Sequence, residues 1–74
     1  MKQTKTILID SRIKKDFHEK IIDYVKTMIL KDGIYKIGYS YYNIEIADDY
    51  NILITINYYR PDAIIKYNTY VVQV

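Results

Sequence analysis

Over most of the chain after Gly33, isoleucine and tyrosine recur at alternate positions, and this pattern constrains the fold more than any other feature. The alternation is densest in residues 34–59, where the polar segment 47–51 divides it into two runs. A period of two is typical of strands that bury one face, and β-branched and aromatic residues favour strands. The second half of the chain is therefore predicted to form antiparallel strands joined by short turns.

The alternation changes phase once inside its first run. Residues 35–41 place their large apolar side chains at odd positions, whereas residues 42–46 place them at even positions. A β-bulge produces such a switch, because one extra residue moves all later side chains to the opposite face. We therefore predict one long strand with a bulge within residues 38–43. Two short strands with a kink at Ser40 are the alternative.

The first half of the chain repeats with the longer period of a helix. Its apolar side chains are spaced by three or four residues, which gives an amphipathic stripe. The stripe consists of Ile13, Phe17, Ile21, Tyr24 or Val25, and Met28. Asp10 and Ser11 are good N-cap residues, and Gly33 suits the position after a helix C-terminus. We expect a helix over residues 11–32, preceded by a short strand at residues 5–9.

These elements follow one another in the order β-α-β-β-β. The third strand is expected at residues 52–59 and the fourth at residues 64–74, with a turn around Pro61 between them. The helix must bury its stripe against one face of the sheet. The predicted fold class is α+β, with one amphipathic helix packed on a four-stranded, mostly antiparallel sheet, in a single domain that spans residues 1–74.

The sequence contains few of the residue types that support catalysis or metal binding. There is no cysteine, one histidine and two glycines, so thiolate sites, histidine-based metal sites and glycine-rich phosphate loops are not expected. His18 lies at the edge of the helical stripe and is interpreted as a solvated or half-buried structural histidine. Asp48 and Asp49 are interpreted as turn residues. We expect no enzymatic activity, no metal and no cofactor.

Localisation and origin are inferred from composition. The N-terminal residues lack the apolar segment of a signal peptide, and no apolar run is long enough to cross a membrane. We therefore expect a cytoplasmic protein with no membrane partner. Ile, Lys, Asn and Tyr have AT-rich codons and account for about half of the residues. Low-GC bacteria, their phages and some archaeal viruses have genomes of this kind. The small size and the lack of catalytic residues favour a phage or mobile element, in which case the protein acts in the cytoplasm of the host cell.

Nucleic-acid binding by a basic helix is an alternative functional hypothesis. The net charge is only +2, but residues 1–36 hold most of the cations. The candidate phosphate contacts are Arg12, Lys15, Lys20 and Lys26. Asp16, Glu19 and Asp23 interrupt this basic row, and most tyrosines that would stack on bases belong to the other half of the chain. The separation of charge from aromatic rings weakens this hypothesis.

The ten tyrosines are the most unusual feature of the composition. Their β-propensity accounts for some of them, but isoleucines can fill the sheet face that the helix covers. Several tyrosines must then lie on the uncovered face, and the sequence offers five candidates. The candidates are Tyr35, Tyr39, Tyr41, Tyr59 and Tyr67. Tyrosine provides a large amphipathic contact area at a small entropic cost, so a tyrosine-rich face favours protein binding.

The leading hypothesis is therefore a small non-enzymatic binding protein whose partner is another protein. By analogy of size and composition, it is compared with phage or mobile-element inhibitors that occupy a host or defence protein, as anti-CRISPR proteins do. A third hypothesis is a structural homo-oligomer. Residues 69–74 contain neither a charge nor a proline that would block strand pairing, so the partner in that case is a second copy in a homodimer.

Overall fold

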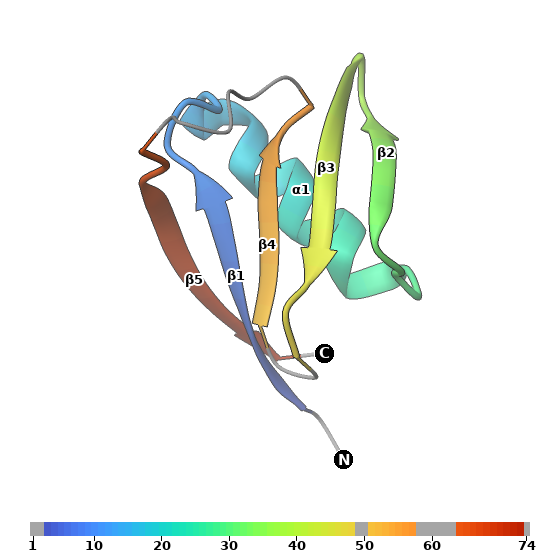
Figure 1. The fold of residues 1–74 in the computed structure, drawn as a ribbon. Coiled ribbons are helices and arrows are strands. Elements are labelled where there is room, and N and C mark those ends of the chain that lie inside the picture. The colour runs from blue at the N-terminus through green and yellow to red at the C-terminus, as the bar shows by residue number, and fades with distance from the viewer. Residues whose placement is uncertain (1–2, 49–50, 58–63, 74) are drawn as a thin grey trace.

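The computed structural model describes residues 3–48, 51–57 and 64–73. The elements follow in the order β1 (Thr4–Asp10), α1 (Lys15–Thr27), β2 (Gly33–Ile37), β3 (Ser40–Ile46), β4 (Asn51–Ile56) and β5 (Tyr67–Gln73). The strands form one sheet in the order β2-β3-β4-β1-β5, and α1 crosses behind it (Figure 1). The predicted α+β class is confirmed. The sheet has five strands instead of four, and it is mixed because β1 and β4 are parallel.

The additional strand arises where the sequence predicted a bulge. β2 and β3 form a hairpin joined by Gly38 and Tyr39. Gly38 has a φ of +66° and Tyr39 a negative φ, which identifies a type II′ turn. A two-residue turn pairs odd with even positions, such as Tyr35 with Tyr42, and so produces the same phase switch as a bulge. The bulge was therefore wrong, and the alternative of two short strands, divided just before Ser40, is correct.

β1 occupies an interior position in the sheet, which the sequence did not predict. The sequence predicted that the strand at residues 64–74 continues the series of adjacent antiparallel strands. β2, β3 and β4 do form an antiparallel meander, but β5 pairs with β1 and not with β4. β1 runs parallel to β4, so that Ile7 lies beside Ile52 and Ile9 beside Ile54. The apolar run at the end of β1 suits this position, because a strand between two neighbours buries more of its side chains than an outer strand does.

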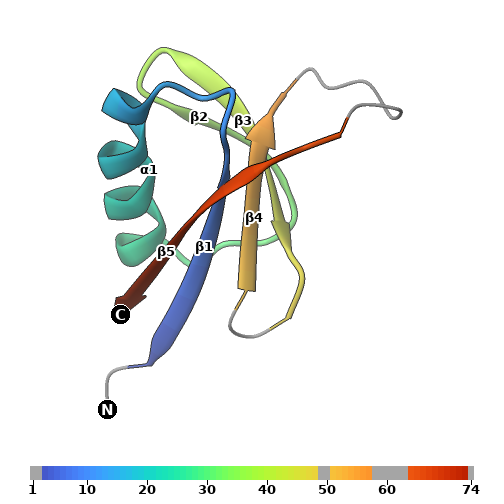
Figure 2. The ribbon, with the colours of Figure 1, turned by 90° about the vertical axis from the view of Figure 1, so that its left-hand side faces the viewer.

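The core lies between α1 and the face of the sheet behind which the helix crosses. The strands contribute isoleucines that share this face through their register. The fully buried ones are Ile7, Ile9, Ile44 and Ile54. Ile21 and Val25 of α1 pack against them, and each fully buried isoleucine contributes about 1.5–3 kcal/mol to stability. Among the described residues, helical cover is present on this face alone, as Figure 2 shows. The opposite side is called the open face below.

Helix α1 is shorter at both ends than the predicted range of residues 11–32. Asp10 does not cap it, because its Oδ1 accepts a hydrogen bond from the Arg12 backbone N–H (2.9 Å) and closes a separate turn between β1 and α1. At the other end, Met28 already has an extended backbone, and Gly33 begins β2. The loop between them gives the chain the length to reach the outer edge of the sheet, where β2 lies (Figure 1).

The buried stripe of α1 is rotated relative to the predicted one. Phe17 and Met28 are 42% and 49% exposed, whereas His18 is 3% exposed. His18 Nε2 donates a hydrogen bond to the Ile13 carbonyl oxygen (2.8 Å), and Nδ1 accepts one from the Tyr70 hydroxyl (2.7 Å). A carbonyl oxygen only accepts, so Nε2 carries the proton. His18 is thus a buried residue that joins α1 to β5, and the expected solvated or half-buried position was wrong.

Candidate functional site

The β2–β3 hairpin distributes the candidate tyrosines over different surfaces. Tyr41 lies on the open face and is 55% exposed, while Tyr39 occupies the turn and is 99% exposed. Tyr67 begins β5 opposite Asp10, on the open face, and is half-buried. Tyr59 lies outside the described residues. Two of the five candidates are therefore strongly exposed: Tyr39 lies in the turn and Tyr41 lies at the start of β3.

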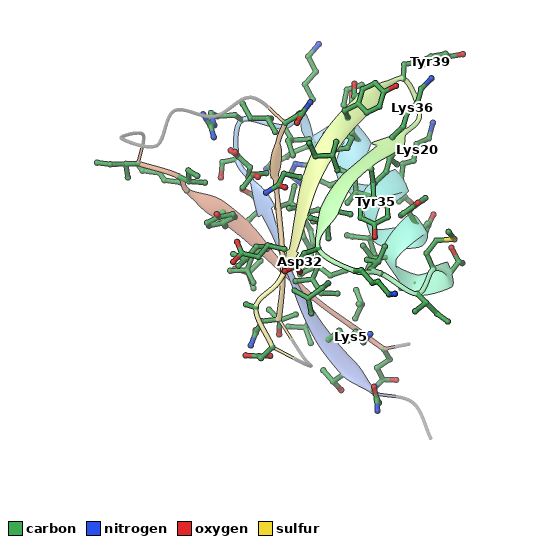
Figure 3. The ribbon with its side chains drawn as sticks, turned by 45° about the vertical axis from the view of Figure 1, so that its right-hand side comes forward. Lys5, Lys20, Asp32, Tyr35, Lys36 and Tyr39 are labelled. Carbon is green, nitrogen blue, oxygen red and sulfur yellow. The ribbon has the colours of Figure 1, made fainter. Side chains whose placement is uncertain are left out.

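Tyr35 faces α1, so its expected place on the open face was wrong. Its ring packs edge-to-face on Tyr24 with 6.1 Å between centroids. Its hydroxyl donates to the Lys31 carbonyl oxygen (2.7 Å) and accepts from the Lys31 N–H (2.9 Å). The physical reason is the two-residue turn, which places Tyr35 on the same side of the sheet as Tyr42. Tyr35 therefore anchors the loop between α1 and β2 (Figure 3).

A pocket of about 520 Å³ opens at the carboxyl ends of β1 and β4, and we call it the strand-end pocket. Its walls come from the β1–α1 connection with the first turn of α1, the β2–β3 turn with the start of β3, and the end of β4. These three segments meet at the upper end of the molecule in Figure 1. The side chains that form its rim are Arg12, Lys14, Phe17, Tyr39, Tyr41 and Asn57. The buried Ile13 and Tyr42 form its floor.

Three aromatic rings in this pocket are accessible to solvent. Phe17 faces outward because the adjacent His18 takes the buried position on α1. Tyr39 stands at the second position of a two-residue turn, where no neighbouring strand covers it. Tyr41 lies on the open face next to this turn. A cluster of exposed large apolar side chains of this kind is typical of an interaction site.

Arg12 is held in place by a buried carboxylate. Asp10 has no exposed surface, and its oxygens accept hydrogen bonds from Arg12 Nε (3.0 and 3.1 Å) and Nη2 (2.6 Å). Burial raises the pKa of the Asp10 carboxyl, but the hydrogen bonds and charge of Arg12 and the Ile56 N–H more than offset this, so the pKa lies below its ordinary value. Nη1 of Arg12 takes no part in these three hydrogen bonds.

Lysines lie close to the aromatic rings. Lys14 lines the pocket, Lys36 Nζ lies 5.9 Å from the centroid of the Tyr41 ring in a cation–π contact, and Lys20 Nζ lies beside the β2–β3 turn. Figure 3 shows Lys20 and Lys36 next to Tyr39 at the end of the hairpin. The expected separation of charge from aromatic rings was therefore wrong, because the fold brings the turn to the first half of α1.

The remaining cations proposed for nucleic-acid binding are not in the pocket. Lys15 and Lys26 are exposed on α1 and do not line it, whereas Arg12 does. None of the described lining residues is a carboxylate. Across residues 3–48, 51–57 and 64–73, no group of three histidine or acidic side chains could hold a metal ion. The same residues include no helix that is long and apolar enough to span a membrane.

Sequence reasoning missed Phe17 and Asn57 as site residues. Phe17 was assigned to the buried stripe, and its exchange with His18 depends on hydrogen bonds to Ile13 and Tyr70 that no local pattern reveals. Asn57 carries no motif and becomes part of the site only because two strands end side by side.

Comparisons with known proteins give no relative for this chain: no protein-family model, curated protein or solved structure matches it.

Proposed function

We propose that this chain is a small non-enzymatic binding protein that holds an acidic segment of another protein in the strand-end pocket. The observation that carries the proposal is the presence, in one pocket, of three exposed aromatic rings and two cations, with no carboxylate among the described lining residues. Aromatic residues and arginine are enriched at protein interfaces and dominate their binding energy.

The pocket suits a peptide with a bulky apolar side chain next to an aspartate or glutamate. Its volume of about 520 Å³ accommodates such a side chain, which would contact the rings of Phe17 and Tyr41 above the floor formed by Tyr42. A neighbouring carboxylate would reach Arg12 Nη1 and the Lys14 ammonium group. Because Asp10 already fixes the guanidinium, little side-chain entropy is lost when the peptide binds.

The charge distribution favours a protein segment over a nucleic-acid strand. Binding a phosphate backbone requires a series of uncompensated cations. The charge of Arg12 is compensated by Asp10, and exposed acidic residues alternate with lysines along α1. These acidic residues are Asp16, Glu19 and Asp23. A short acidic peptide carries few charges, so the Lys14 ammonium group and a hydrogen bond from the Arg12 guanidinium would suffice to bind its carboxylate.

Occupying the surface of another protein is a simple way to inhibit it. The small size and AT-rich composition support an inhibitor or accessory protein of a phage or mobile element that acts in the host cytoplasm on a host or defence protein. Inhibition of this kind requires no catalytic group, because the partner protein is inactive as long as it is bound.

The proposal is tested by selecting displayed random peptides on the immobilised protein and measuring the affinity of selected peptides by fluorescence anisotropy. We expect enrichment of peptides that combine acidic with bulky apolar residues. Their affinity should fall at least ~10-fold in the Tyr39→Ser/Tyr41→Ser double variant, which corresponds to about 1.4 kcal/mol. Ile29→Ser is the matched control, because Ile29 is 96% exposed and follows the opposite end of α1.

Two results would contradict the proposal. One is the absence of acidic residues from the selected peptides. The other is an equal loss of affinity in the Ile29→Ser control, because this residue lies far from the pocket.

Single-stranded nucleic acid is a second candidate ligand, favoured by the presence of Arg12 and Lys14 beside Tyr39 and Tyr41 in one pocket. Bases stack on aromatic side chains while cations contact the phosphates. A labelled oligothymidylate, titrated at low and at physiological salt, tests it. Tight binding at low salt that is lost in Tyr39→Ser/Tyr41→Ser would favour nucleic acid over the acidic peptide; no binding at low salt would exclude it.

A further inference from the structure

Among the described residues, β5 is an outer strand with one unpaired edge, and it lacks the features that usually protect such an edge. It contains seven residues and has neither a charged side chain nor a proline. The outer strand on the opposite side of the sheet, β2, has five residues and includes Lys36. Charges, prolines and short length are the features that prevent outer strands from pairing with other chains. Figure 2 views the molecule from the β5 side, and among the described residues no strand pairs with its outer edge.

The apolar side chains of β5 are also incompletely covered on both faces. On the side of α1, Tyr70 and Val72 are half-buried, whereas Ile7, which pairs with Tyr70 on the adjacent strand, has no exposed surface. On the open face, Val71 is 67% exposed. The burial of apolar side chains therefore decreases from β1 to its neighbour β5. An additional strand paired with β5 would cover apolar surface on both faces of the sheet.

We propose that this edge pairs with a second copy of the chain, β5 against β5, in antiparallel orientation about a two-fold axis perpendicular to the sheet. This axis keeps each face on its own side. The two five-stranded sheets become one continuous sheet with both helices on the same face. Such an interface is self-complementary, because each contact occurs twice about the axis.

A second copy fits this edge better than an unrelated peptide does. The side chains of β5 offer no charge that would select a complementary sequence, and for the same reason two copies do not repel each other. Antiparallel pairing brings the apolar positions 70–72 of both copies together and gives hydrogen-bond partners to the outward backbone groups of both strands. The chain is also near the lower size limit for a domain, where additional burial is most valuable.

Sedimentation equilibrium from micromolar to millimolar concentration tests the dimer. We expect a mass twice that of the 8.9 kDa chain in the wild type and a shift to monomer in Val71→Lys, which introduces like charges across the axis. Circular dichroism verifies that this variant is folded, since Val71 is exposed. Ile34→Lys is the matched control, because Ile34 is 59% exposed on the outer strand β2 and should leave the dimer intact.

A wild type that stays monomeric over the whole range would overturn the dimer, as would dissociation by Ile34→Lys to the same extent as by Val71→Lys. Single-cysteine variants at residues 67–73 give an independent measurement, because the chain has no cysteine of its own. Oxidation should link the two copies only at positions next to the two-fold axis. If none of these variants forms a cross-link, the proposed dimer is likewise overturned. Tyr39→Ser should not affect the dimer, so the dimer and the pocket are tested separately.

Discussion

Four tyrosines of the β2–β3 hairpin form two groups with opposite environments. Tyr35 and Tyr42 pair across the strands and face α1, where Tyr42 is 5% exposed and Tyr35 is bound to the Lys31 backbone. Tyr39 and Tyr41 are exposed and border the strand-end pocket. The two-residue turn at Gly38 produces this division, because it inverts which positions face the helix. Residue type alone therefore does not determine which tyrosines are exposed; the length of one turn does.

The largest contrast is expected between two adjacent residues, Tyr41 and Tyr42. Tyr42→Ser should lower the free energy of unfolding by about 3 kcal/mol, since it leaves a cavity in the core. Tyr41→Ser should lower it by less than about 1 kcal/mol, as is usual for an exposed side chain. Urea denaturation of both variants measures the difference. Equal losses would mean that the turn does not separate the two tyrosines.

Substitution of Gly38 acts on the turn that creates the contrast. Gly38→Ala should cost about 1–2 kcal/mol, because a φ of +66° is unfavourable for a residue with a Cβ. Steric contact is not the cause, since the added Cβ would lie 3.6 Å from the flexible Lys20 side chain. Thermal unfolding compared with an exposed control, Ser40→Ala, provides the measurement. A variant as stable as the control would show that the turn is not type II′ in solution.

Removing one hydroxyl tests the structural role of Tyr35. Tyr35→Phe keeps the ring against Tyr24 but loses the two hydrogen bonds to Lys31, so stability should decrease by about 1 kcal/mol. Peptide binding should be unchanged, because Tyr35 does not line the pocket. Denaturation and anisotropy on the same sample check both statements. A selective loss of binding would place Tyr35 in the site instead.

The smallest effect is expected from the carboxylate that holds Arg12. The pKa of Asp10 lies below its ordinary value of 3.8 in the folded state, so its contribution to stability is present above about pH 4 and is lost as the pH falls through the folded pKa. Asp10→Asn should therefore be less stable than the wild type at neutral pH, and the gap should narrow below about pH 4. Urea midpoints of both proteins at several pH values measure this gap. A gap independent of pH would mean that the pKa of Asp10 is the same in the folded and unfolded states.

Local sequence patterns predicted the layers of this fold but not the order of its strands. The alternation correctly placed Ile44 and Ile54 under the helix, because each strand keeps a period of two whatever its neighbours are. The position of β1 between β4 and β5 depends on pairings such as Ile7 with Ile52, which join distant parts of the chain and leave no local signal. The same limit applies to His18, whose partner Tyr70 lies 52 positions away.

The candidate site was predictable only in part for a related reason. Tyr39, Tyr41 and Arg12 were recognised individually, from composition and charge. Their assembly into one pocket requires the β2–β3 turn and the β1–α1 connection to meet at the ends of β1 and β4. A phase switch in the sequence does not distinguish a bulge from a two-residue turn, and only the turn brings these segments together.

Nuclear magnetic resonance titration of the isotopically labelled protein with a selected acidic peptide tests the central claim most directly. Chemical shift changes should concentrate at Arg12, Lys14, Phe17, Tyr39 and Tyr41, with little change at Tyr35. Changes centred instead on open-face residues away from the pocket, such as Leu53 and Thr69, would contradict the account, because they would place the binding surface on the middle of the sheet.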